Sequence, residues 1–281
     1  MSLEALTVFD CPFPKKRIGK ANYGGYVIVD LPSTSSISNT SNISNTSNIS
    51  NTFGISSISS GYDMFISGGI SNDISFEDAL LDNYPDLDCC LAFDGTVNSI
   101  PNARNEAKIK FIKKNLGSIN GVDISNLEEY IQPYENIFMK IDIEGHEYGL
   151  FNSIIENGLM PKIRQLVLEI HSPADIRKHP NYYTNLAAFG RTDNVLLNFL
   201  ANLKKTHTIM HLHANNGCAT HIQDGGVIIP NVFEITLLRN DILEGIGYNW
   251  PLNTTPIPSS LDMPNIPSNT DIRLNYPPFC N

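Results

Sequence analysis

The stretch Ile137-Phe-Met-Lys-Ile-Asp-Ile-Glu-Gly-His-Glu-Tyr148 indicates both a fold and the position of a site. Residues 137–141 are apolar except for Lys140, which is typical of a strand covered on both faces. Ionisable side chains follow immediately around a glycine: Asp142, Glu144, His146 and Glu147. Ligands of open α/β sheets bind just outside the carboxyl ends of the strands. The sequence therefore predicts chemistry at the end of this strand.

A second stretch, Leu166-Val-Leu-Glu-Ile-His171, repeats this design. Residues two apart on a strand share a face, so Glu169 and His171 are expected to act together. A histidine titrates near neutral pH, which makes His171 the preferred general base. The alternative is a structural histidine at the end of a strand.

Composition limits the classes of partner. The chain has 281 residues, of which 41% are hydrophobic, enough for the core of one large domain or two small ones. Its net charge of −10 argues against binding to a nucleic-acid backbone. No apolar run reaches the roughly 18 residues of a membrane span, and the N-terminal residues do not resemble a signal peptide. The five cysteines form no CxxC pair. We expect a cytoplasmic protein with no membrane or nucleic-acid partner.

Two segments depart from the rest in composition. Residues 33–60 repeat Ser, Asn, Thr and Ile and have little large apolar surface, which indicates a flexible insertion. Strand-like sequence lies on both sides of it, so residues 1–281 are interpreted as one domain. Residues 250–281 are rich in Pro and Asn and are expected to run over the surface as a tail.

Strand-like and helical patterns alternate along the remaining sequence. Strands are expected at 25–31, 62–67, 87–94, 109–113, 137–141, 166–171, 208–212 and 232–238, and helices at 76–81, 127–131, 148–157 and 193–203. This alternation predicts an α/β fold with a Rossmann-like, mostly parallel sheet of about seven strands. The last two strands are separated by turn residues, so they are expected to pair antiparallel at an edge.

The turns after the first strands carry residues suited to a nucleotide-like ligand. In Ser67-Gly-Gly-Ile-Ser-Asn-Asp73 the glycines would let the backbone approach a ligand closely, although such a turn can also be purely structural. Asp94, after the next strand, could accept hydrogen bonds from ribose hydroxyls or serve only as a turn residue. Asn115 follows the third strand, where an adenine edge could be recognised.

Taken in order, these features resemble the FkbM-like family of class I S-adenosylmethionine-dependent methyltransferases. Lys140-Ile-Asp-Ile-Glu-Gly-His-Glu147 is similar to that family's Lys-x-Asp-x-Glu-Gly-x-Glu signature. Arg17-Ile-Gly-Lys20 and Gly24-Gly-Tyr-Val-Ile28 resemble the lead-in of its eukaryotic and large-virus branch. The resemblance implies the class I methyltransferase sheet and S-adenosylmethionine as cofactor.

With this resemblance, the expected cofactor-binding residues are Ser67, Gly68, Gly69, Asn72, Asp73, Asp94, Asn115 and Asp142. The chain departs from the family's usual Asp-x-Gly-Ala-Asn motif, because Ser67 stands in place of the leading acid. Asp73 or Glu77 could supply the missing charge for the amino group of the cofactor.

The expected function is O-methylation of a hydroxyl on a small polar acceptor such as a sugar or glycan. Asp142, Glu169 and His171 are the candidate catalytic residues. The candidate substrate-binding residues are Glu144, His213, Asn215 and Asn216. A divalent cation on Asp142, Glu169 and Asn215 is a less favoured alternative.

Two other functions stay open at this point. One is a catalytically silent relative, and the other is a nucleotide-sugar-handling enzyme. The sequence does not indicate an oligomeric state.

Overall fold

The computed structural model describes residues 3–31, 61–172, 192–222 and 226–281, so the expected insertion at 33–60 lies outside the described residues. Its centre is a seven-stranded sheet in the order β10-β13-β9-β8-β3-β4-β5. In chain order the strands are β3 (Met64–Gly68), β4 (Cys90–Phe93), β5 (Ile109–Ile112), β8 (Ile137–Ile141), β9 (Ile163–His171), β10 (His207–Ala214) and β13 (Val232–Arg239).

The directions of the strands confirm the predicted fold class. β13 runs antiparallel to both β9 and β10, and the other neighbouring pairs are parallel. This is the order and direction of the Rossmann-like class I methyltransferase sheet. The last two strands do pair at an edge, and the reversed strand, β13, lies one place in from the outermost strand, β10. The chain changes direction across the sheet between β3 and β8, which is its topological switch point.

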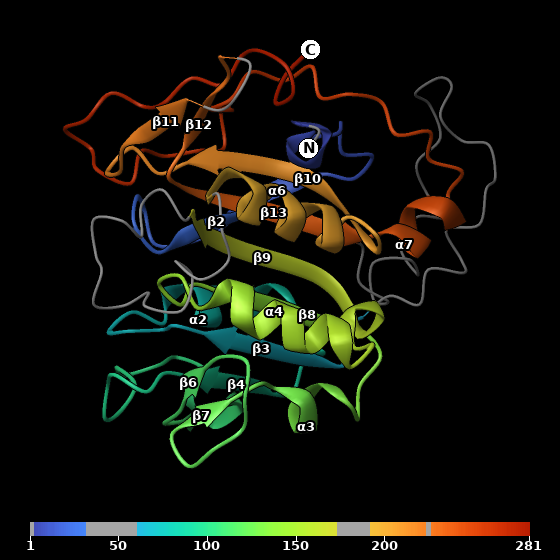
Figure 1. The fold of residues 1–281 in the computed structure, drawn as a ribbon. Coiled ribbons are helices and arrows are strands. Elements are labelled where there is room, and N and C mark those ends of the chain that lie inside the picture. Colours follow the sequence, from blue (N-terminus) through green and yellow to red (C-terminus); the bar gives the residue numbers. More distant parts are fainter. Residues whose placement is uncertain (1–2, 32–60, 173–191, 223–225) are drawn as a thin grey trace, which may run out of the picture.

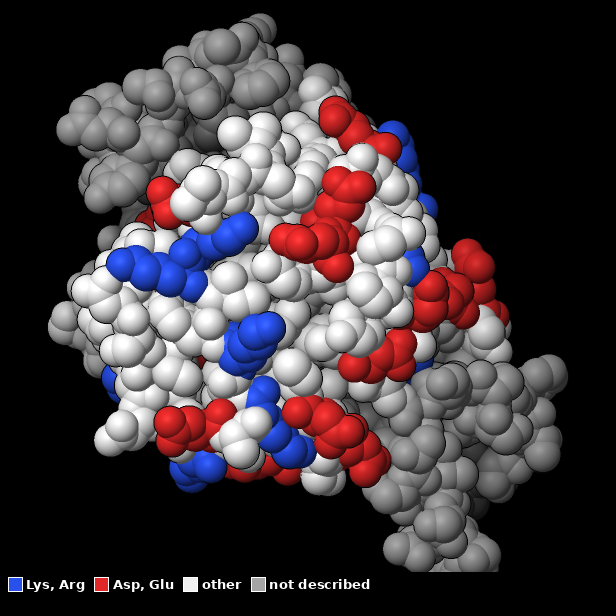
Figure 2. Space-filling view, turned by 90° about the horizontal axis from the view of Figure 1, so that it is seen from below, with Lys and Arg blue, Asp and Glu red and all other residues white. Residues whose placement is uncertain are grey.

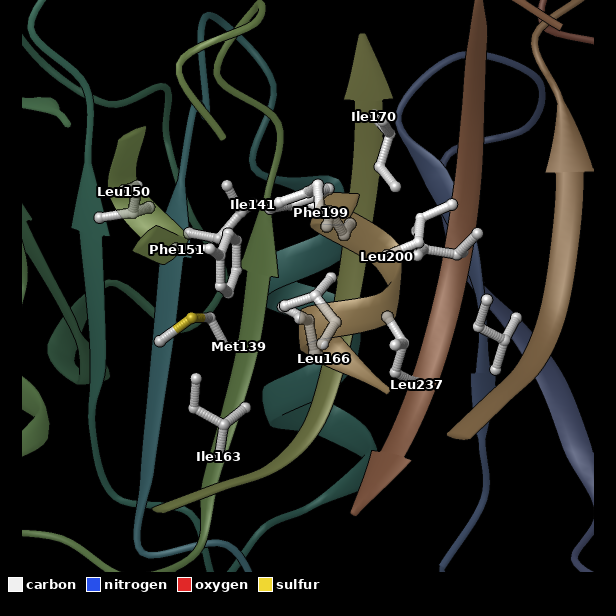
Figure 3. Packing of buried hydrophobic residues seen from close by; sticks show 14 of the residues in the cluster. Met139, Ile141, Leu150, Phe151, Ile163, Leu166, Ile170, Phe199, Leu200 and Leu237 are labelled. Atoms are coloured by element: carbon white, nitrogen blue, oxygen red, sulfur yellow. The ribbon is translucent and has the colours of Figure 1, made fainter. Parts of the chain in front are cut away.

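Two helices cover one face of the sheet, as Figure 1 shows: α4 (Glu147–Glu156) and α6 (Thr192–Leu203). Their apolar side chains meet those of the strands in a single buried cluster, shown in Figure 3. The members labelled there are Met139, Ile141, Leu150, Phe151, Ile163, Leu166, Ile170, Phe199, Leu200 and Leu237. Because the other face is covered as well, β3, β4, β8 and β9 are buried along their whole length. This burial explains why they are continuous apolar runs and not alternating ones.

The opposite face is covered by α2 (Ser75–Asn83), α7 (Asn240–Gly245) and a hairpin of β1 (Lys15–Gly19) and β2 (Gly25–Val29). The strand expected at 25–31 therefore pairs with β1 and stays outside the central sheet. The Gln165 amide of β9 joins the hairpin to the sheet, accepting from Val29 N at 2.7 Å and donating to Val29 O at 3.0 Å.

The remaining elements are short. They are η1 (Leu3–Leu6), η4 (Glu106–Lys108), β6 (Asn115–Leu116), β7 (Ile124–Ser125), α3 (Glu128–Ile131), η5 (Met160–Lys162), β11 (Thr220–Ile222) and β12 (Ile228–Pro230). α3 corresponds to the helix expected at 127–131. None of the helices in the described part of the chain is long and apolar enough to cross a membrane.

The C-terminal segment, residues 250–281, is anchored to the body of the protein along the β10 side of the sheet, as the red trace in Figure 1 shows. Apart from one bridge between Phe9 and Leu252 it forms no strand, and it forms no helix. Leu274 and Phe279 are nevertheless fully buried and belong to the same core cluster as the apolar residues of α4 and α6. The segment therefore takes part in the fold and can supply residues to a site.

Charges of both signs are interspersed on the face shown in Figure 2. The described part of that face therefore presents no continuous basic patch of the kind that follows a phosphate backbone. The absence of a nucleic-acid partner stays a prediction.

Candidate functional site

A cavity of about 710 Å³ opens at the carboxyl ends of β3, β4 and β8, beside the topological switch point. Its volume lies within the range of roughly 300–1,000 Å³ that is usual for small-molecule and cofactor sites. The turns after these strands form one wall, and the β1–β2 hairpin together with the C-terminal segment contributes the other.

The glycine turn after β3 is required by close packing. Gly69 has φ +76° and donates its N–H to Phe93 O at 2.9 Å. A Cβ atom at this position would lie 1.6 Å from Asp142 O. Only glycine therefore lets the ends of β3 and β8 meet at the wall of the cavity.

Asp94 connects two of the turns that line the cavity. One carboxylate oxygen accepts from Ser71 N at 2.8 Å, and the other accepts from Thr96 N at 2.7 Å and Thr96 Oγ1 at 2.6 Å. Burial opposes ionisation, but the hydrogen bonds from Thr96 and Ser71 outweigh it and lower the pKa of Asp94. Asp94 is therefore an anion that the protein holds in place before a ligand binds, and Oδ2, with Ser71 N as its donor, can accept a further hydrogen bond.

Glu77 brings a buried carboxylate to Ser67, on the strand before the glycine turn. Ser67 Oγ donates to Glu77 Oε1 at 2.5 Å, and both side chains are buried. Glu77 Oε2 has no hydrogen-bond partner among the described residues, and Glu77 lines the cavity. Burial raises the pKa of Glu77, while the nearby Lys140 ammonium acts in the opposite direction. An unmet carboxylate oxygen here suits a cationic hydrogen-bond donor.

Asp142, directly after β8, lines the cavity with half of its carboxylate engaged. Its Oδ2 accepts from Tyr26 Oη at 2.9 Å, whereas Oδ1 has no partner among the described residues. Burial and the charge of Asp142 raise the pKa of Tyr26, so the phenol remains a donor. Lys140 Nζ lies 5.4 Å from the centroid of the Tyr26 ring and donates to Gly69 O. These contacts fix one Asp142 oxygen and leave the other to meet a ligand.

His171 lies between two carboxylates. Its Nε2 is 3.3 Å from Glu144 Oε2 and its Nδ1 is 3.2 Å from Glu147 Oε1. Glu147 Oε1 also accepts from the backbone N–H groups of Ile143 and Gly145, so it caps the first turn of α4. Burial lowers the pKa of His171, but the two acids outweigh burial and raise it well above its usual value. A protonated imidazole has no free lone pair, so this arrangement does not fit a general base.

A row of polar side chains crosses the strand ends behind Asp142. Glu169 of β9 is paired directly with Glu234 of β13, and Glu234 is paired with His213 of β10. Asn215 Nδ2 donates to Glu169 at 2.9 Å. Burial raises the pKa of Glu169 well above its usual value, and the charge of Asp142 adds to this effect. The row is therefore rich in acid and poor in compensating cations.

The structure brings seven of the expected site residues to the cavity wall: Gly69, Asn72, Asp73, Asp94, Asn115, Asp142 and Glu144. It places the following seven outside that wall: Ser67, Gly68, Glu169, His171, His213, Asn215 and Asn216. Ser67 acts through Glu77 instead, and Asn216 holds the C-terminal segment by donating to the Ile266 and Asn269 carbonyls.

Sequence reasoning did not assign Tyr23, Tyr26, Thr96 or Asn265 to the site, yet all of them line the cavity. The stretch Gly24-Gly-Tyr-Val-Ile28, which contains Tyr26, could have indicated that Tyr26 belongs to the site. No signal in the sequence marked Asn265, which lies in the segment expected to be a surface tail.

Three residues could supply ligand atoms to a divalent cation. Asp142, Glu144 and His171 each offer one atom, and these atoms lie within 4.8 Å of one another. This set differs from the expected one, because Asn215 is engaged with Glu169 and with Gly217 N. A metal here would require His171 to lose its proton, against the pull of both neighbouring acids.

No family model and no curated protein matches the chain. Two solved structures with a weak likeness are methyltransferase proteins. One is the methyltransferase domain of a bacterial Hen1, with 10% identity and a TM-score of 0.33, covering 63% of this chain and 89% of that one. The other is a human methyltransferase 10 domain containing protein, with 12% identity and a TM-score of 0.27, covering 63% and 70%. At these scores the fold rests on the strand order of this chain itself.

Proposed function

We propose that this chain is an S-adenosylmethionine-dependent methyltransferase, related to the FkbM-like family, that methylates a hydroxyl of a small polar acceptor. The observation that carries the proposal is the position of the cavity. It lies at the switch point of a sheet with the class I strand order and is lined in turn by the Gly69 turn, Asp94, Asn115 and Asp142.

The residues present fit the cofactor by their chemistry. Glu77 Oε2 is a buried acceptor without a partner in the described part of the chain, which suits the amino group of the methionine moiety. Asp94 and Asn115, on the turns after β4 and β5, suit the ribose and the adenine edge. The acid that the family motif carries on the strand before the turn is thus replaced by one from α2.

The bound cofactor would supply an electrophilic methyl group. The acceptor hydroxyl would lose its proton to Asp142 Oδ1 as its oxygen takes that methyl group, and the electron pair of the broken carbon–sulfur bond would stay with the departing thioether. Tyr26 holds Oδ2 and so orients the carboxylate. His171, paired with two acids, orders the loop after β8 and takes no proton itself.

Thermal unfolding with S-adenosylhomocysteine tests the cofactor assignment. Ligand at 100 times its dissociation constant stabilises a protein by about 2.7 kcal/mol. Glu77→Gln should weaken binding by roughly 10-fold to 100-fold, because a buried hydrogen bond to a charged group is lost. Asp82→Asn is the matched control, since Asp82 lies on the same helix, pairs with Arg104 and is outside the cavity.

Several results would contradict the proposal. The absence of a shift with either S-adenosylmethionine or its demethylated product would reject a cofactor site. A shift with UDP-glucose alone would favour a nucleotide-sugar enzyme. A shift without methyl transfer to a panel of sugars and glycans would favour a silent relative.

A further inference from the structure

The cavity wall holds three buried side-chain atoms that have no hydrogen-bond partner among the described residues. They are Glu77 Oε2, Asp142 Oδ1 and Asn265 Oδ1. All three are acceptors, and none of the partnerless buried donors of the described chain belongs to a residue of this wall. Buried polar groups are normally paired, so whatever fills the cavity must bring hydrogen-bond donors to these points.

The wall has two halves, defined by its elements: α2 with the turns after β3 and β4 forms the first, and the end of β8 with the C-terminal segment forms the second. Glu77 belongs to α2, in the first half, where the amino group of the cofactor accounts for it. Asp142 and Asn265 belong to the other half. Asn265 is only 4% exposed, and its Nδ2 donates to Glu234 Oε1 at 3.0 Å, which holds the amide in place. The cofactor assignment leaves this second pair unexplained.

The second half also adjoins several acidic side chains. Glu169 and Glu234 lie outside the cavity wall, and the charges of Asp142 and Glu234 both raise the pKa of Glu169 after the larger effect of burial. Among the cations, Lys140 donates to Gly69 O, and Arg17 donates to Asn22 O but keeps two buried nitrogens without a partner among the described residues. His213 is shared between Glu234 and Asp271, and His171 lies between the two acids of the β8–α4 loop. A neutral ligand would satisfy the acceptor atoms, whereas a cationic ligand would satisfy them and also favour the ionised form of these carboxyl groups.

We propose that the methyl acceptor is an amino alcohol, such as an amino sugar, whose ammonium binds Asn265 Oδ1 in the field of Glu234 and Glu169. Its neighbouring hydroxyl meets Asp142 Oδ1. This inference rests on the proposed function and names the class of its acceptor. In the reaction the hydroxyl oxygen would take the methyl group as the carbon–sulfur bond breaks with its electron pair on sulfur, the hydroxyl proton would pass to Asp142, and the ammonium would keep its charge.

The test compares amines with their hydroxyl analogues. Protein saturated with S-adenosylhomocysteine is titrated calorimetrically at pH 7 with glucosamine and glucose, galactosamine and galactose, and 2-aminoethanol and ethylene glycol. At least one amine should bind 10-fold or more tightly than its analogue. Asn265→Leu should remove that preference, whereas Asn265→Asp should strengthen binding of the amine and leave its analogue unchanged.

Asn269→Leu is the matched control. Asn269 lies on the same segment and bonds to Asn216, but it is exposed and outside the cavity wall. If it reduces the preference as much as Asn265→Leu does, the effect comes from loosening the segment and the proposal is wrong.

Three further outcomes would overturn the proposal: equal binding within every pair, no binding of any amine, or stabilisation by Mg²⁺ in place of the amines. Failure of S-adenosylhomocysteine to bind would instead reject the proposed function. In that case the binding of amines and of their hydroxyl analogues is compared on the protein without S-adenosylhomocysteine. The failure of the acceptor assignment and the failure of the proposed function can therefore be distinguished.

Discussion

The two halves of the cavity differ in how well the protein's own hydrogen bonds stabilise the ionised carboxylates in or beside them. Asp94 accepts three hydrogen bonds from two turns, and these lower its pKa. Glu169 receives one amide hydrogen bond and stands near Asp142 and Glu234, and its pKa is raised. The first half is therefore organised before any ligand binds, whereas the second half adjoins a carboxyl group whose ionised form the protein disfavours.

The largest expected effect comes from the turn that joins the halves. Gly69→Ala should lower the free energy of unfolding by more than about 3 kcal/mol and abolish cofactor binding, because the new Cβ would meet Asp142 O and φ is positive. Urea unfolding followed by S-adenosylhomocysteine titration measures both effects. Gly158→Ala is the control, with φ +69° but nothing within 4 Å of its Cβ, and it should cost only about 1–2 kcal/mol. Similar losses in the two variants would show that close packing at Gly69 is unimportant.

Asp94→Asn should destabilise the protein by about 2 kcal/mol at pH 7, because its hydrogen bonds lose their charge assistance. The pKa of Asp94 is lowered in the folded state, so its contribution is present above the unfolded pKa of about 3.9 and is lost as the pH falls through the lower folded value. Urea unfolding between pH 2.5 and 7 measures this. A variant as stable as the parent at pH 7 would show that the first half is not organised by this acid.

Glu169→Gln should change stability in the opposite direction. The pKa of Glu169 is raised on folding, so the stability that it contributes is full below the unfolded pKa of about 4.3 and declines as the pH rises towards the folded value. A neutral isostere removes this decline, so the variant without ligand should be more stable than the parent by about 1 kcal/mol at pH 8 and by less at pH 5. Destabilisation at pH 8 would mean that another group already balances the charge.

The smallest expected effect concerns the segment that closes the second half. Although burial acts in the opposite direction, Glu234 and the acids of the segment raise the pKa of His213 to about 9. The stability that His213 contributes is full below about pH 6.5 and is lost as the pH rises through about 9. Hydrogen exchange of residues 262–272, corrected for intrinsic rates, should increase over this range in the parent. His213→Gln should remove that pH dependence, with a change of about 1 kcal/mol or less. If the pH dependence of hydrogen exchange is the same in the variant as in the parent, His213 does not hold the segment in place.

Several features were predictable because they depend on local patterns. The apolar run at 137–141 and the acid directly after it place Asp142 at a strand end, and the same logic places Asp94 and Gly69. The alternation of elements indicated a parallel sheet, and the turn residues before 232–238 indicated the antiparallel pair. Periodicity and turn chemistry act over a few residues, so the sequence carries them directly.

The roles of other residues depend on partners that local patterns do not reveal. Glu169 and His171 share a strand and were expected to act together, yet His171 meets Glu144 and Glu147, and Glu169 meets Asn215. Each of these contacts spans 20 or more residues or crosses between elements. The charge on a neighbour decides a pKa, and a neighbour in space is not visible in the order of the chain.

The sequence by itself therefore determined the sheet, the turns at its carboxyl edge and the glycine and acids on them, because each follows from the backbone conformation of a short segment. Only the tertiary structure decided which acidic side chains have hydrogen-bond or ion-pair partners. It brought Glu77 into a hydrogen bond with Ser67, Asn265 into a hydrogen bond with Glu234, and two carboxylates to His171. Long-range packing sets these contacts because it sets burial and the distance between charges.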